Sequence, residues 1–232
     1  MEREKPIQDC RCQGCNFKSI PASILNNEEL KILCNNSVHI EFQPGEKIIK
    51  QGSFTTNIVY LTQGLAKLHM TGPLNKDEIL KIAKSSVFIG VPSVFADRIF
   101  HYSVSALTKC EACFIDFNSF EQLVKDNGTF AHELIISLSE DVIGHFHRCV
   151  NKTQKNKTGY IAEILLDFAD NYFESNDFTL PLSRAEFGEL IGSSRETVIR
   201  ILQEFINDGL IKDEGKKITI IEKEKLEKIS ER

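Results

Sequence analysis

The sequence has no long hydrophobic segment. No apolar run in its 232 residues approaches the roughly 18 residues that a helix needs to cross a bilayer. The first residues are polar and charged, so the N-terminus also lacks the apolar core of a secretory signal peptide. These two absences argue against a membrane partner and against secretion, and we therefore expect a cytoplasmic protein.

The motifs of several common enzyme classes are also missing. The sequence contains no Walker phosphate-binding loop, no G-x-S-x-G nucleophile elbow and no H-E-x-x-H zinc motif. Its histidines and acidic residues are scattered, and their spacing alone does not assemble a catalytic site. We therefore do not expect an enzyme.

The composition indicates a globular chain and leaves its partners open. A hydrophobic content of 41% over this length suits one large or two modest domains. The net charge of -5 does not indicate nucleic-acid binding, but DNA affinity depends on the local charge that faces the phosphates. Seven cysteines in a chain expected in the cytoplasm indicate metal, redox or core roles rather than a disulfide framework.

Residues 182–202 have the pattern of a helix, a tight turn and a second helix. Gly192 lies between the helices and supplies the permissive turn that a helix-turn-helix needs. Two serine–glutamate pairs fit capping boxes, Ser183 with Glu186 and Ser193 with Glu196. At about 100° per residue, the apolar residues of the second helix share one face that can dock on its domain. This apolar face consists of Val198, Ile201, Leu202 and Phe205.

The opposite face of the second helix predicts binding to double-stranded DNA. Arginine can bond bidentately to guanine, glutamate can accept from the cytosine amino group, and an apolar residue suits the thymine methyl. Any single residue here is equally consistent with an ordinary surface helix, and the whole arrangement favours DNA binding. The candidate DNA-binding residues are Ser193, Ser194, Arg195, Glu196, Thr197, Ile199, Arg200, Lys216 and Lys217.

The segment around the helix-turn-helix predicts a winged DNA-binding domain over residues 151–232. Residues 178–182 form a short strand, and a hairpin over 210–221 forms a wing whose tip carries Lys216 and Lys217, suited to phosphate contacts. Residues 222–232 form a terminal helix. Residues 151–159 are polar and basic and break the helical pattern, which indicates a linker at the domain boundary.

A long amphipathic helix is predicted before this linker. Its broad apolar stripe needs more than its own domain to cover it, which favours parallel pairing with a second subunit over a core helix of a monomer. Its histidines are expected on the polar face, and metal or haem binding is the alternative. The stripe comprises Phe130, Leu134, Leu138, Val142, Phe146 and Cys149, and the histidines are His132, His145 and His147.

Residues 38–116 show short apolar alternations broken by turns, which predict a sandwich or barrel of strands. A short helix is expected before them, over residues 21–36, with Asn26 or Asn27 as a cap before Glu28 and Glu29. Another helix is expected after them, over residues 118–124. Together with the long helix, these elements define a first domain over residues 1–150.

The segments Ser194–Arg200 and Leu182–Gly192 resemble the helix-turn-helix of the Crp/Fnr family of bacterial transcription regulators. The glycine pattern at Gly45, Gly52, Gly64 and Gly90 resembles the cyclic-nucleotide-binding β-roll of that family. The resemblance implies an α+β fold with an N-terminal antiparallel β-roll, a long dimerisation helix and a C-terminal winged helix-turn-helix. It also implies a homodimer that binds a palindromic promoter site and contacts RNA polymerase.

The resemblance implies a particular DNA half-site. In the cAMP-receptor branch of the family, the residues that match Arg195, Glu196 and Arg200 read a TGTGA-type sequence. The Fnr branch replaces the first arginine. We therefore expect a TGTGA-like site.

The N-terminal cysteines are candidate ligands of a metal or an iron–sulfur cluster. Cys10, Cys12 and Cys15 are close enough in sequence to share one centre. Cys12 and Cys15 resemble part of the Fnr-branch cluster motif, and Cys113 resembles its distant fourth ligand. One later N-terminal cysteine of that motif has no counterpart here, so Cys10 would substitute for it. Structural zinc and surface thiols remain alternatives.

The family's nucleotide site is altered in this sequence. The resemblance places the ribose-binding carboxylate after Gly90, where Val91 stands, and the phosphate-binding arginine–serine pair near His101 and Tyr102. Cyclic AMP is therefore not expected as the ligand, and a redox, oxygen or nitric oxide signal is predicted. The alternative is a metal- or redox-binding sensor whose main output is not DNA binding, which the reading face of the second helix argues against.

Overall fold

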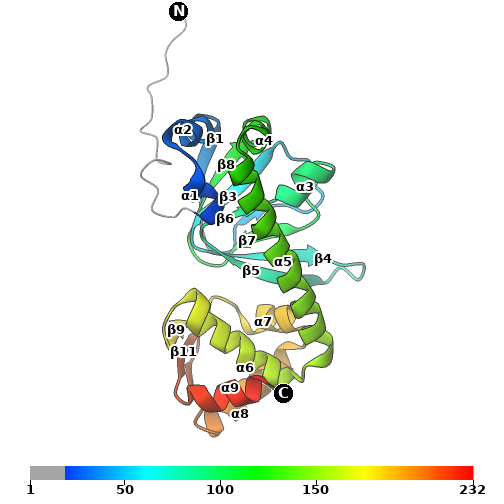
Figure 1. The fold of residues 1–232 in the computed structure, drawn as a ribbon. Coiled ribbons are helices and arrows are strands. Elements are labelled where there is room, and N and C mark those ends of the chain that lie inside the picture. Colours follow the sequence, from blue (N-terminus) through cyan, green and yellow to red (C-terminus); the bar gives the residue numbers. More distant parts are fainter. Residues whose placement is uncertain (1–18, 232) are drawn as a thin grey trace, which may run out of the picture. The chain divides into compact units, whose positions relative to one another are not determined.

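The computed structural model describes residues 19–231, which form helices and antiparallel strands (Figure 1). By contacts the chain divides into two compact units. One unit joins the described residues up to Ala66 with Ala83–Asp141, and the other joins Lys67–Ile82 with Val142–Arg232. The expected α+β class is confirmed. No helix within residues 19–231 is long and apolar enough to span a membrane.

The strands before the long helix form two four-stranded antiparallel sheets. Their orders are β1-β8-β3-β6 and β2-β7-β4-β5. The strands are β1 (Ser37–Phe42), β2 (Lys47–Ile49), β3 (Asn57–Gln63), β4 (Leu65–Thr71), β5 (Asp77–Lys84), β6 (Val87–Ile89), β7 (Ser103–Ala106) and β8 (Cys110–Asp116). Short helices accompany them, namely α1 (Ile20–Ile24), α2 (Asn27–Asn35), α3 (Val91–Ala96) and α4 (Phe117–Asp126).

An aromatic cluster forms much of the core of the first unit. Phe120 and Phe130 are fully buried and pack edge-to-face, with ring centroids 5.7 Å apart. Phe88 packs against both rings. Helices α2 and α4 and the start of the long helix thus share one apolar cluster with β3 and β8.

The helix expected over residues 21–36 is in fact two helices. Asn26 adopts an extended backbone between α1 and α2, and its side chain accepts hydrogen bonds from the backbone N–H groups of Glu28 and Glu29. The Glu29 carboxylate accepts from the Asn26 N–H in return. This capping box confirms the cap expected at Asn26 or Asn27, but it starts a new helix at Asn27 where one helix over residues 21–36 was predicted.

The long helix α5 (Gly128–Gln154) is confirmed, and it continues further than the sequence pattern indicated. Residues 151–154 are helical, and only Lys155 and Asn156 separate α5 from α6 (Lys157–Asp167). The irregular linker predicted over residues 151–159 is therefore wrong. Polar contacts cross the junction between the two helices, where Asn151 Nδ2 donates to Glu163 Oε1 at 2.9 Å and Lys155 Nζ pairs with Glu163 Oε2 at 2.5 Å.

The C-terminal part of the chain contains a helical layer and a three-stranded sheet. After α6 come one π-helical segment (Phe168–Tyr172), β9 (Asp177–Thr179), α7 (Arg184–Ile191), α8 (Arg195–Asn207), β10 (Ile211–Glu214), β11 (Lys217–Ile220) and α9 (Lys223–Ser230). The sheet order is β10-β11-β9, so the expected wing hairpin pairs with the strand that precedes α7.

Candidate nucleic-acid interface

Helices α7 and α8 meet at a tight turn that depends on two glycines. Gly192 ends α7 in the left-handed conformation, with φ of 63°. The Ser193 N–H then donates to the Gly188 carbonyl oxygen at 2.9 Å. A Cβ atom on Gly188 would lie 2.7 Å from the Ser193 carbonyl oxygen, closer than atoms in contact can approach. The turn therefore requires a residue without a side chain at Gly188 as well as at Gly192.

The first predicted capping box is confirmed and the second is wrong. Ser183 and Glu186 cap α7 reciprocally. Helix α8 is capped by Ser194, whose hydroxyl oxygen accepts from the Thr197 N–H at 3.2 Å. Ser193 cannot take that position because its own N–H closes the turn onto Gly188.

Helix α8 has the two faces that the sequence predicted. Val198 and Ile201 are completely buried, and Leu202 and Phe205 are 2% exposed. On the other side, Arg195, Glu196 and Arg200 are exposed, and Ile199 is 43% exposed despite its apolar side chain. The helix is thus fixed by its apolar face and presents two arginines, one glutamate and one isoleucine outward.

The outward face of α8 extends further than the sequence analysis recognised. Gln203, Glu204 and Asn207 line one shallow depression together with Glu196, Ile199 and Arg200. Gln203 follows Ile199 by four residues, Glu204 follows Arg200 by four, and Asn207 follows Gln203 by four, and this helical spacing was a signal that could have identified them. The Arg200 guanidinium donates from Nη1 to Glu204 Oε1 at 2.5 Å, and a guanidinium has further N–H donors that can contact a base.

Glu196 is held in its charged form at the start of α8. A hydrogen bond from its own backbone N–H, and then one from the Ser194 hydroxyl, lower the pKa of the Glu196 carboxyl below its usual value. An ionised carboxylate only accepts hydrogen bonds. Glu196 can therefore receive an amino group of a base, and it repels phosphates.

The two candidate lysines of the wing differ. Lys216 is exposed in the turn between β10 and β11. Lys217 lies on β11, and its Nζ is 3.2 Å from Asp177 Oδ2. The wing is braced by Arg184, whose Nη2 donates to Asp213 Oδ2 at 2.5 Å and to the Gly215 carbonyl oxygen at 2.8 Å. Lys216 is thus the more available of the two for a phosphate.

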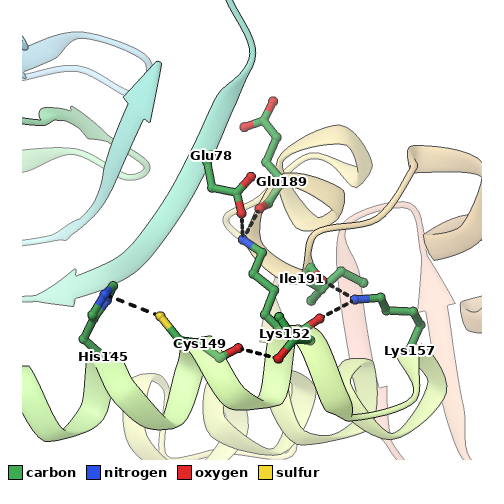
Figure 2. Close-up of polar contacts among 8 residues, drawn as sticks. Glu78, His145, Cys149, Lys152, Lys157, Glu189 and Ile191 are labelled. Carbon is green, nitrogen blue, oxygen red and sulfur yellow. Dashed lines mark hydrogen bonds and ion pairs between the residues drawn. The ribbon is translucent and has the colours of Figure 1, made fainter. Parts of the chain in front are cut away.

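Two lysines at the end of α5 and the start of α6 hold the end of α7, and the sequence analysis assigned them no such role (Figure 2). The Lys152 ammonium donates to the Glu189 carbonyl oxygen at 3.1 Å, and Lys157 donates to the Ile191 carbonyl oxygen at 2.9 Å. Lys152 also pairs with Glu78 of β5, in the same compact unit. Burial, and then repulsion by Lys152, lower the pKa of Lys157. Carbonyl groups at a helix end attract cations, so the lysines fix the helix that precedes the turn.

The candidate metal ligands are only partly described. Cys10, Cys12 and Cys15 lie outside the described residues. Cys113 lies on β8, half-buried against the apolar cluster, and pairs in register with Tyr60 on β3. Within residues 19–231, no three His, Cys, Asp or Glu side chains gather as a metal site.

The segment of the predicted nucleotide site is filled by its own side chains. Gly90, with φ of 89°, starts α3, and its N–H donates to the Tyr102 hydroxyl oxygen at 3.1 Å. Val91 is 3% exposed. Burial raises the pKa of Tyr102 to about 12. His101 is exposed, and its Nε2 lies 3.0 Å from Asp97 Oδ2. The Gly90 N–H is thus already hydrogen-bonded to Tyr102, whereas it could otherwise donate to a bound anion.

Comparison with known proteins agrees with this geometry. Residues 39–127 match the cyclic nucleotide-binding domain, and residues 161–229 match the Crp-like helix-turn-helix domain. The chain is 28% identical over 187 residues to the cAMP-activated global transcriptional regulator CRP of Escherichia coli O6:H1, covering 78% of this chain and 89% of that protein. It is 22% identical over 228 residues to the transcriptional activator protein FnrA of Stutzerimonas stutzeri, covering 95% and 91%.

The fold is also found in solved structures. FixK2 from Bradyrhizobium japonicum superposes with a TM-score of 0.75 at 15% identity, covering 83% of this chain and 96% of that one. The β-roll, the long helix and the exposed α8 thus define a DNA-binding transcription regulator of the helix-turn-helix class. The chain belongs to the Crp/Fnr family, whose members are transcription regulators rather than enzymes.

Proposed function

We propose that this regulator binds a palindromic, TGTGA-like promoter site as a homodimer and contacts RNA polymerase there. The observation that carries the proposal is the outward face of α8, where Arg195, Glu196, Ile199 and Arg200 are all exposed. Residues 151–232 form the DNA-binding domain and residues 1–150 the sensory domain in this proposal.

Each residue of the face has a specific task in the major groove. Arg195 and Arg200 donate to guanine, Glu196 accepts from the cytosine amino group, and Ile199 contacts a thymine methyl. The start of α8, with Ser193, Ser194 and Thr197, and the wing, with Lys216 and Lys217, contact phosphates and set the register.

The dimer forms along α5. Large apolar side chains on this helix are exposed, including Ile135 at 62%, Val142 at 51% and Phe146 at 62%. A parallel pair of α5 helices covers them and gives the two α8 helices the twofold symmetry that a palindrome requires.

The signal is a redox change, oxygen or nitric oxide rather than cyclic AMP. Tyr102 and Val91 support this, since they fill the segment where a nucleotide would need a phosphate donor and a carboxylate. The E. coli relative is cAMP-activated by name, and this chain has Val91, His101 and Tyr102 where the family resemblance places the carboxylate and the arginine–serine pair.

An iron–sulfur cluster is the proposed sensor, held by Cys10, Cys12, Cys15 and Cys113. The Ser19 N–H donates to the Tyr60 hydroxyl oxygen at 2.7 Å, and Tyr60 pairs in register with Cys113. Cys15 is four residues before Ser19 in sequence, and four residues span at most about 14 Å. The chain therefore permits the N-terminal cysteines to reach Cys113.

Replacing Arg200 tests the DNA readout. Binding of full-length Arg200→Ala to a TGTGA palindrome and to duplexes with single base changes should show a loss of about 1–3 kcal/mol of discrimination per half-site. Lys225→Ala removes one positive charge from α9 and should keep the wild-type discrimination. If both variants discriminate as wild type does, α8 does not read the site through Arg200.

A further inference from the structure

Phe130, Leu134 and Leu138 of the predicted stripe on α5 pack in the core of the first unit. A second, exposed stripe on the same helix has the spacing of a two-stranded coiled coil. Its members alternate by four and three residues, which is the spacing of heptad core positions. The core positions are Ile135, Ser139, Val142, Phe146, Cys149 and Thr153. All six are exposed in the single chain. In a parallel pair of helices, a residue at such a position faces the same residue of the second copy.

Cys149 is therefore a core position of the proposed dimer, and it already has a neighbour that can bind metal (Figure 2). Its Sγ lies 3.4 Å from Nε2 of His145, one turn earlier on the same helix. Both residues are exposed. Thiolate and imidazole groups separated by one helical turn can thus converge on one point.

The separation of the two atoms fits a tetrahedral zinc ion. Zinc binds thiolate sulfur at about 2.3 Å and imidazole nitrogen at about 2.0–2.1 Å. At a tetrahedral angle these bond lengths place sulfur and nitrogen about 3.5 Å apart. The 3.4 Å between Cys149 Sγ and His145 Nε2 is close to this separation.

We propose that His145 and Cys149 of two copies of the chain form a metal site across the dimer axis, with two thiolates and two imidazoles around one zinc-like divalent cation. This inference rests on the dimer of the proposed function. One copy supplies two ligands, and two copies complete a four-coordinate set. Tetrahedral geometry with two sulfur and two nitrogen ligands is typical of zinc sites.

Metal binding releases protons and links the two α5 helices. One cation replaces two thiol protons, so that two Cys149 side chains become thiolate ligands, two protons are released and no electron is transferred. The ion links the two helices three residues before Lys152, which holds the Glu189 carbonyl oxygen at the end of α7. The site therefore lies next to the residues that position the helix-turn-helix.

Cobalt titration tests the site, because tetrahedral cobalt with thiolate ligands absorbs visible and near-ultraviolet light. The protein is the full chain with Cys10, Cys12 and Cys15 replaced by serine, which removes the other candidate thiolates, kept reduced and anaerobic. We expect thiolate-to-cobalt absorption that saturates at one cobalt per two chains and disappears when zinc is added. Adding Cys149→Ser or His145→Gln should abolish or strongly weaken this absorption.

His147→Gln is the matched control, since His147 is an exposed histidine on α5 only two residues before Cys149, and residues two apart on a helix do not face each other. It should bind cobalt as the parent does. The inference would be overturned if no thiolate absorption appeared, if cobalt saturated at one ion per chain, or if Cys149→Ser bound cobalt fully. A Cys149 disulfide between chains in place of metal binding would also overturn it.

Light scattering and DNA binding, measured on these samples and on the anaerobic wild-type chain, separate this inference from the proposed function. A metal-free dimer that binds the palindrome but takes up no cobalt overturns only the metal site. A protein that stays monomeric with and without metal overturns the dimer and the shared site together.

Discussion

Two regions that resemble functional sites of the same family differ in this protein. The outward face of α8 is open, with Arg195 and Arg200 exposed and Ile199 uncovered. The segment at Gly90 is closed, since the Tyr102 hydroxyl accepts the Gly90 N–H and Val91 is buried. The difference supports the proposal that α8 binds DNA and that the segment at Gly90 does not bind a cyclic nucleotide. It also shows that a match to a domain model identifies a fold, and that the side chains in the site decide the ligand.

The largest loss of stability and DNA binding should follow from a change in the turn between α7 and α8, which positions the exposed face of α8. Gly188→Ala places a Cβ 2.7 Å from the Ser193 carbonyl oxygen, so α7 and α8 have to separate. We expect a loss of about 1–3 kcal/mol in the free energy of unfolding, the range for overpacked sites, measured by urea denaturation, together with weaker DNA binding.

Gly128→Ala is the control for that change. Gly128 begins α5, and a Cβ there meets no atom within 4 Å. This variant should unfold at the wild-type urea concentration or slightly above it. Equal stability of Gly188→Ala and wild type would show that the turn is looser than described.

A smaller loss of stability should follow from a change at Tyr102, in the closed segment at Gly90. Tyr102→Phe removes the hydroxyl acceptor of the Gly90 N–H and should cost about 1 kcal/mol in the free energy of unfolding. Calorimetry should detect no cyclic AMP binding to the wild type or to this variant, because no arginine or carboxylate is restored. Micromolar cyclic AMP binding by the wild type would contradict the description of this segment as closed.

The smallest effect should be a pH dependence at the start of α7. Burial opposes ionisation of Glu186, but the Lys67 ammonium and the Ser183 N–H outweigh it and lower the pKa of this carboxyl below 4.5. A carboxyl group whose pKa is lower in the folded than in the unfolded protein stabilises the fold at pH values above its unfolded pKa. This stabilisation is lost as the pH falls through the folded pKa.

Glu186→Gln should therefore flatten the stability profile on the acidic side. The comparison is made by urea denaturation of both proteins between pH 7 and about 3.5, the region of the unfolded carboxyl pKa. A profile as steep for the variant as for the wild type would show that other carboxylates dominate the acid response.

The features of the open region that follow from local periodicity could be predicted from the sequence. The two faces of α8, the Ser183 cap and the turn at Gly192 each depend on residues a few positions apart. The second cap was misplaced by one residue, because Ser193 and Ser194 are equally good caps until the Ser193 N–H is committed to Gly188.

Contacts between distant residues could not be predicted in the same way. The contacts of Lys152 and Lys157 with α7 join residues 37 and 34 positions apart. They could not be predicted because a basic stretch is equally consistent with a solvated linker. The sequence showed that Tyr102 stands where the family pattern has serine. Its bond to Gly90 depends on how the intervening loop folds, which no local pattern specifies.

The central claim is that α8 reads a TGTGA-like palindrome in a dimer that does not use cyclic AMP. Fluorescence anisotropy of anaerobically purified protein, at one fixed salt concentration, measures its affinity for that palindrome and for a scrambled duplex with and without cyclic AMP. We predict at least about a 10³-fold preference for the palindrome, unchanged by cyclic AMP. Equal affinity for both duplexes, or a preference that appears only when cyclic AMP is added, would contradict the account.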